Sequence, residues 1–293
     1  MPANLKEVRG RIASVNSTIQ ITKAMKMVSA AKFKRATDRI IQIRPYSTQL
    51  SSILSNIAGS LQGDVSISYA QQRPVKRVLI VLITSDKGLC GGFNANNIKV
   101  VKTLLANDYK DLVEKKCVDF LCIGKKGNDA FKSTKMYINR EFISLFTKLN
   151  FEEGGKAAQY IMDAFNSGDY DQVDVVYGQF KNAAVQVATK EQFLPIQFEA
   201  PTSKTNADYS FEPGKEQLLE ELVPKILKTQ FFRYLLDSNA SEHGARMTAM
   251  DKASENANEL LKELRLSYNR ARQAAITTEL TEIVSGAAAL SGA

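Results

Sequence analysis

The residues with the clearest chemical potential lie in a glycine-rich segment, residues 85–94 (SDKGLCGGFN). The segment follows an apolar run and precedes a helical pattern, a position where backbone amides often bind phosphate. The spacing of Gly88, Gly91 and Gly92 matches neither G-x-G-x-x-G nor G-x-x-x-x-G-K-[ST]. We therefore favour a tight turn with close backbone packing, and phosphate binding is the alternative.

Other reactive side chains are few. His243 is the only histidine, and Cys90, Cys117 and Cys122 form no C-x-x-C pair. This composition predicts reduced, mostly buried thiols, and it removes most support for Ser-His-Asp catalysis or a zinc site. Histidine can titrate near neutrality, but we favour for His243 a position on a helix surface, at a flexible joint beside Gly244. We predict no catalytic set, no cofactor and no metal.

Positive charge is concentrated at the start of the chain. Residues 4–44 contain ten lysines and arginines against two acidic residues, which equals the net charge of +8 of the whole chain. Such a segment favours an acidic surface, which is a nucleic acid, an anionic membrane or an acidic protein. Two function classes stay open beside a protein-binding role. One is a nucleotide-dependent enzyme that uses the glycine-rich segment, and the other is a basic coiled-coil module for nucleic acid or membranes.

The composition is that of a globular protein. The chain has 293 residues, of which 44% are hydrophobic and 24% charged. Its longest strongly apolar run, residues 78–84, is much shorter than the roughly 18 residues of a membrane span. Charged residues follow Met1 closely, so we expect no secretory signal.

Both ends of the chain carry helical patterns. Residues 3–58 contain one proline and one glycine, and apolar residues recur at alternating steps of three and four. The pattern loosens after Thr22, through Met25, Val28 and Ala31. The predicted seam residues of this first helix are Leu5, Val8, Ile12, Val15 and Ile19.

Residues 245–285 contain no glycine or proline and repeat this spacing. The two helices are predicted to pair as an antiparallel coiled coil, with the second extending roughly 15 residues further. The predicted seam residues of the second helix are Met250, Ala253, Ala257, Leu260, Leu264, Ser267, Ala271, Ala274, Thr278 and Thr281.

A change of period between the helices predicts a sheet. Residues 77–84, 117–123 and 173–180 are short β-rich runs separated by helical stretches, which favours a parallel, doubly wound α/β domain. Residues 185–194 follow too closely for a crossover and are expected to return as an antiparallel hairpin. The predicted parts are residues 1–58 (coil helix), 76–198 (Rossmann-like α/β domain) and 214–293 (coil helix).

Four segments together resemble the gamma-subunit family of F-type ATP synthases, bacterial type. They are residues 21–28 (ITKAMKMV), 85–92 (SDKGLCGG), 240–250 (ASEHGARMTAM) and 268–289 (YNRARQAAITTELTEIVSGAAA). The resemblance spans the whole chain. It implies a central rotor shaft, present once per complex, that couples proton-driven rotation of a membrane c-ring to ATP synthesis or hydrolysis.

The resemblance also implies partners and a location. The partners are the alpha and beta subunits, whose beta sites perform catalysis, together with the epsilon subunit and the c-ring; no nucleic acid is involved. The chain itself is a non-catalytic, peripheral subunit at the cytoplasmic face of the bacterial inner membrane. Gly244 and Thr278 stand where the family pattern suggests alanine and glutamine.

Residue roles follow from the same resemblance. Hexamer contacts are implied near the lever loop of beta, at the base of the coil and at its apex. They are Lys23, Met25, Lys26, Lys87, Cys90, Arg272, Gln273, Thr277 and Glu279. Contacts to the membrane ring are implied at Tyr209, Phe211 and Glu212.

Overall fold

The computed structural model describes residues 5–60, 68–183, 185–197 and 215–291. Two long helices enclose the remaining elements in the sequence. The elements in order are α1 (Leu5–Ser60), η1 (Ser68–Ala70), β1 (Val78–Ile83), α2 (Phe93–Ala106), α3 (Lys110–Glu114), β2 (Val118–Ile123), α4 (Lys125–Phe131), β3 (Ile138–Asn139), η2 (Leu145–Lys148), α5 (Phe151–Asn166), β4 (Gln172–Phe180), β5 (Gln186–Leu194) and α6 (Lys215–Ser291).

The chain forms two compact units. The first, called the coil unit, combines residues 1–28 with residues 247–293; the second, called the sheet unit, comprises residues 29–246. These units divide both long helices, whereas the ranges predicted from the sequence follow element boundaries. Among the described residues, no helix has the length and hydropathy needed to cross a bilayer.

The sheet has the strand order β3-β2-β1-β4-β5. β1 pairs in parallel with β2 and β4, and β5 returns antiparallel to β4. The predicted parallel sheet and its hairpin are confirmed. The two-residue strand β3 and the short helix α3 were not predicted, because neither is long enough to show a period.

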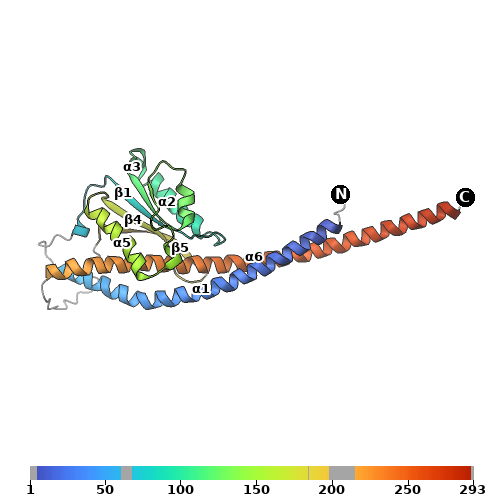
Figure 1. Cartoon of the computed structure of the whole chain (residues 1–293), viewed down its shortest axis with the longest axis horizontal. Helices are drawn as coiled ribbons and strands as arrows, with labels where there is room; N and C mark the ends of the chain where they lie inside the picture. Colours follow the sequence, from blue (N-terminus) through green and yellow to red (C-terminus); the bar gives the residue numbers. More distant parts are fainter. Residues whose placement is uncertain (1–4, 61–67, 184, 198–214, 292–293) are drawn as a thin grey trace. The chain divides into compact units, whose positions relative to one another are not determined.

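The two faces of the sheet bury alternate residues of the same strands. Val78, Ile80 and Leu82 of β1 pack in a cluster with residues of α2 and α4, while Leu79, Val81 and Ile83 join a cluster with α5 and α6. Figure 1 shows α2 and α5 on opposite sides of the sheet. Because both faces are covered, every residue of β1 and β2 is buried and β1 is apolar throughout, so the doubly wound arrangement is confirmed.

In the coil unit, α1 runs antiparallel to α6 (Figure 1). Arg9 donates a 3.0 Å hydrogen bond to the Tyr268 hydroxyl, and the hydroxyls of Thr22 and Ser254 lie 2.7 Å apart. Residue numbers therefore rise along one helix as they fall along the other. The buried and half-buried seam positions are Leu5, Val8, Ile12, Val15, Ile19 and Thr22 on α1, and Met250, Ser254, Ala257, Leu261, Leu264, Tyr268, Ala271 and Ala275 on α6.

Four predicted seam residues are wrong, because Leu260, Ala274, Thr278 and Thr281 are exposed. Leu260 is 46% exposed, and its neighbour Leu261, which is 8% exposed, occupies the seam. Met250, Ala257 and Leu264 belong to both the predicted and the observed seam, and they recur every seven residues. They therefore do not decide whether the next seam position lies three or four residues after each of them. It follows by four, which places polar Ser254 in the seam.

The seam of α1 also continues past Thr22. Val28 is 57% exposed and Ala31 is exposed, whereas Lys26, Ser29 and Phe33 are half-buried or buried. The spacing of three and four is therefore unbroken, and it appeared to loosen only because polar side chains occupy several of its positions.

Candidate partner-contact site

The glycine-rich segment links β1 to α2 and is fixed by its carbonyl groups. Arg246 donates hydrogen bonds from Nη2 to the main-chain oxygens of Lys87 (3.0 Å) and Gly88 (3.3 Å). The Ser85 hydroxyl donates to the same Lys87 oxygen at 2.7 Å. A phosphate loop would instead direct N–H groups at its ligand, so the arrangement is that of a turn anchored on α6.

This turn presents some side chains and buries others. Leu89 has a positive φ of 63° and is 64% exposed, and Lys87 is also exposed. Cys90 is 2% exposed and clusters with Phe93 and Ala245. The burial of Cys90 does not agree with its expected role as a partner contact, and Lys87 is the member of the predicted pair that solvent reaches.

Arg246 is itself held in a buried ionic cluster. Its Nη1 lies 2.6 Å from Glu242 Oε1, with both side chains about 10% exposed. Burial raises the pKa of Glu242, and the positive charge of Arg246 opposes this shift. The cluster is a candidate that the sequence did not reveal, although an E-x-x-x-R spacing on a helix is a recognisable signal.

His243 belongs to the same cluster. Burial, followed by the charges of Arg246 and Lys32, lowers the pKa of His243 to about 4. The imidazole is therefore neutral at pH 7. Because arginine only donates, His243 Nδ1 accepts from Arg246 Nη1 at 3.3 Å. His243 lies on a helix as predicted, but its ring is half-buried in this cluster and not on the helix surface.

A second polar network ties α6 to the β4–β5 hairpin. Glu191 accepts from the Tyr177 hydroxyl (2.5 Å) and from Arg233 Nη2 (3.4 Å). One turn further along α6, Asp237 accepts from Arg44 of α1 at 3.3 Å. Burial is the largest cause that raises the pKa of Asp237. These bonds connect α1, α6 and the hairpin within the sheet unit.

The predicted hexamer contacts in the coil unit fall into two zones. Lys23 is exposed and Met25 half-buried on α1, while Lys26 Nζ lies 2.5 Å from Asp251 of α6. The second zone is near the end of α6, where all four predicted residues are exposed: Arg272, Gln273, Thr277 and Glu279. Eighteen residues of helix separate Ser254, beside the first zone, from Arg272, a distance of about 27 Å.

The remaining predicted contacts, Tyr209, Phe211 and Glu212, lie outside the described residues. Three or more histidine, cysteine or carboxylate side chains do not gather into a possible metal site anywhere in the described ranges.

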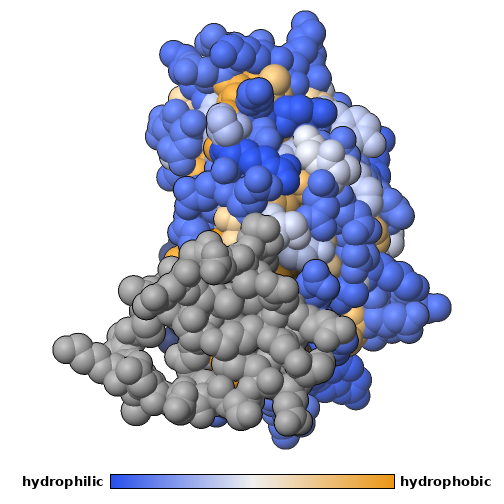
Figure 2. All heavy atoms as spheres, turned by 90° about the vertical axis from the view of Figure 1, so that its left-hand side faces the viewer, coloured by the Kyte–Doolittle hydropathy of each residue, from blue (hydrophilic) through white to orange (hydrophobic). Residues whose placement is uncertain are grey.

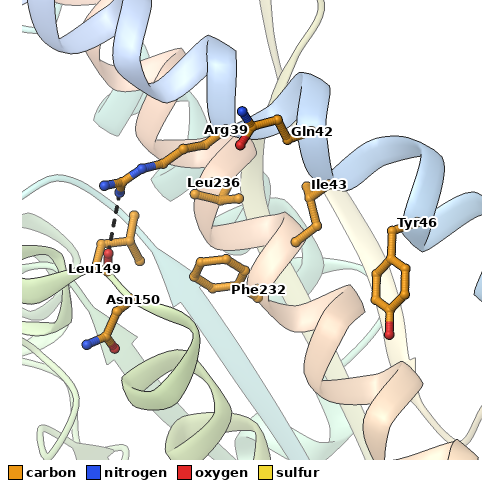
Figure 3. Close-up of a pocket in the computed structure, with 8 residues that line it drawn as sticks. All are labelled: Arg39, Gln42, Ile43, Tyr46, Leu149, Asn150, Phe232 and Leu236. Carbon is orange, nitrogen blue, oxygen red and sulfur yellow. Dashed lines mark hydrogen bonds between the residues drawn. The ribbon is translucent and has the colours of Figure 1, made fainter.

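The sheet unit contains an apolar groove that none of the predicted contacts occupies (Figure 3). Its volume is about 450 Å³. It is lined by Arg39, Gln42, Ile43 and Tyr46 of α1, by Leu149 and Asn150 before α5, and by Phe232 and Leu236 of α6. The face of the molecule in Figure 2 is, for its described residues, largely hydrophilic, with apolar side chains in small separate areas.

A long antiparallel helical coil formed by the two ends of the chain, with a doubly wound sheet inserted between them in the sequence, defines a stalk-type assembly subunit. Residues 4–290 match the family described as ATP synthase. The chain belongs to the ATP synthase gamma chain family.

Two bacterial relatives illustrate the match. The chain is 56% identical to the gamma chain of Cytophaga hutchinsonii, covering 99% of each chain. It is 52% identical to the gamma chain of Flavobacterium psychrophilum, covering 99% of this chain and 100% of the relative.

Solved structures agree with the fold. A chain of the Tetrahymena thermophila mitochondrial ATP synthase central stalk and c-ring aligns at 27% identity with a TM-score of 0.58, covering 80% of this chain and 99% of that one. A chain of the Euglena gracilis mitochondrial ATP synthase aligns with a TM-score of 0.66 over 98% of this chain and 94% of that one. At 22% identity, the second likeness concerns the fold alone.

Proposed function

We propose that this chain is the central rotor shaft of an F-type ATP synthase. Its partners are the alpha and beta subunits, the epsilon subunit and the membrane c-ring, with one copy of the chain in each complex. The full-length match to bacterial gamma chains carries this proposal. The antiparallel coil supplies the physical means, since two bonded helices resist twisting while keeping an asymmetric outline.

Coupling follows from that asymmetry. As the shaft turns, different sides of the coil meet successive beta subunits and favour their open or closed states, which differ in nucleotide affinity. Lys23 and Met25 offer an exposed cation beside a half-buried thioether for one contact zone. Arg272, Gln273, Thr277 and Glu279 offer the second, and Lys87 a third at the turn after β1.

Catalysis belongs to the partner subunits in this proposal. The turn at residues 85–92 presents carbonyls to Arg246, which does not suit an anion. By resemblance to the bacterial family, the complex lies at the cytoplasmic face of the inner membrane and couples protons. Tyr209, Phe211 and Glu212 are proposed ring contacts on the resemblance alone.

Rotation in an assembled complex tests the function. A probe is attached at Lys110→Cys, an exposed position on α3, in a chain whose native cysteines are replaced by alanine. With the alpha and beta subunits immobilised, Mg-ATP should drive stepwise rotation of the probe. A complex that hydrolyses ATP with a stationary probe would refute the shaft role.

Calorimetry on the isolated chain tests the non-catalytic role separately. We expect no Mg-ATP site with a dissociation constant below roughly 10 μM. A stoichiometric site lost in Lys87→Ala would instead support the nucleotide-dependent enzyme.

A further inference from the structure

We propose that the groove between α1, α6 and the segment before α5 is a docking site for an acidic amphipathic helix of a partner subunit. The site lies entirely in the sheet unit and uses none of the residues assigned above to the hexamer. The inference goes beyond the shaft function, since it names a further contact surface and the chemistry of its partner.

The floor of the groove is apolar. Ile43, Leu149, Phe232 and Leu236 converge on it from three segments, as Figure 3 shows. Leu236 is only 1% exposed, so the groove reaches down to side chains of the packed interior. A volume of about 450 Å³ can accommodate several side chains of a partner.

Exposed aromatic rings lie at the margin of this floor. Tyr46 is 57% exposed and lines the groove. Phe151, which is 49% exposed, packs edge-on against Phe232 with ring centroids 5.5 Å apart. Large apolar surfaces beside a groove are typical of protein contacts, because aromatic anchors provide much of the binding energy there.

The charge of the rim is positive. Arg39 lines the groove, and it donates a long hydrogen bond of 3.5 Å to the Leu149 oxygen. Arg35, one turn earlier on α1, and Lys148, next to Leu149, are both exposed. The nearby carboxylates Glu152 and Glu153 both form ion pairs with Lys156. Asp38, which precedes Arg39 in the sequence, is a further acidic residue nearby. A partner with carboxylates on its polar face complements this rim.

The form of the groove favours a helix as its occupant. Two of its walls are the helices α1 and α6, and a third helix packs into such a groove by inserting side chains spaced three and four residues apart. Its apolar face would cover Phe232 and Ile43 while its acidic face meets Arg39 and Arg35.

Site-specific photocrosslinking in the assembled ATP synthase tests this proposal. p-Benzoyl-phenylalanine is placed at Tyr46, and at Ile41 as the control, which is 62% exposed on α1 but does not line the groove. We expect the Tyr46 probe to form an adduct with a partner peptide that is helical, apolar on one face and acidic on the other. Arg39→Glu should lower the yield of that adduct about fivefold or more, and Arg39→Lys should largely retain it.

Each outcome decides the proposal. An adduct at Tyr46 with a basic or non-helical segment, or equal yields of the same adduct from Tyr46 and Ile41, overturns it. So does the lack of an adduct in a complex that assembles with either Tyr46 or Gln42 replaced by the probe. Assembly with the alpha and beta subunits is measured by copurification, so failure of the shaft function is distinguished from failure of the docking site.

Discussion

Arg246 Nη2 donates a 3.0 Å hydrogen bond to the main-chain oxygen of Lys87, although the two residues are 159 positions apart in the sequence. This bond anchors the turn after β1 to α6. The positive charge of Arg246 is balanced by the carboxylate of Glu242, so the turn, the arginine and the carboxylate depend on one another.

Replacing Arg246 with alanine should therefore lower the free energy of unfolding by about 3 kcal/mol, because Glu242 is left buried without its cation. Amide hydrogen exchange in residues 85–92 should become faster as well. Denaturant titration and exchange mass spectrometry measure the two effects. Arg265→Ala, at an exposed position of α6, is the matched control and should change stability by less than about 0.5 kcal/mol. Unchanged exchange in the turn would contradict the role of Arg246.

Neighbouring leucines of α6 should respond differently to truncation. Leu261→Ala should cost about 2–3 kcal/mol, since the side chain is 8% exposed in the seam. Leu260→Ala should cost well under about 1 kcal/mol, because that side chain is 46% exposed. Denaturation of the full chain followed by circular dichroism measures both. The reverse order would restore the seam phase predicted from the sequence.

Stability should depend on pH through His243. The pKa of His243 is lowered to about 4 in the folded protein, against about 6.5 unfolded. The unfolded chain therefore binds more protons between these values, and this residue's contribution to stability is lost as the pH falls from about 6.5 to 4. The slope from this residue is at most about 1.4 kcal/mol per pH unit.

His243→Gln should flatten that decline while leaving the profile above pH 7 nearly parallel to that of the unmodified protein. Glu242 acts in the opposite direction, since its pKa is raised, and the glutamine variant retains it. Denaturant titrations at pH 7.5, 5.5 and 4.5 give the comparison. An identical slope in both proteins would show that His243 does not titrate as described.

Two helical glycines should differ in their tolerance of alanine. A Cβ at Gly244 would lie 3.2 Å from Phe33 Cε2 and 3.3 Å from the Ala183 oxygen, so crowding should cancel the gain in helix propensity. At Gly10 a Cβ meets nothing within 4 Å, and Gly10→Ala should stabilise by about 0.8 kcal/mol. Thermal denaturation compares them. Equal stabilisation by both would mean that α1 moves aside at Phe33.

The sequence predicted most of the fold, because long helices and buried strands have strong periods. It missed the seam phase because Ser254 and Tyr268 are polar in type yet occupy coil positions, where they bond to Thr22 and Arg9. It missed the Glu242–Arg246 cluster's contact with the turn at Lys87 because that contact is tertiary and leaves no local pattern. The sequence did not predict the groove at Phe232 for the same reason, since three separate segments build it.

The last half-buried position of the α6 seam is Ala275, and the helix continues to Ser291. These final residues form about 24 Å of helix, and they are exposed wherever the structure describes their side chains. A single helix twists more under a given torque than two helices bonded along their length. The shaft therefore has two segments of different torsional stiffness, and the softer segment is the unpaired end of α6. A torque that partners apply at this end would therefore twist it through a larger angle per unit length than the paired part of the coil.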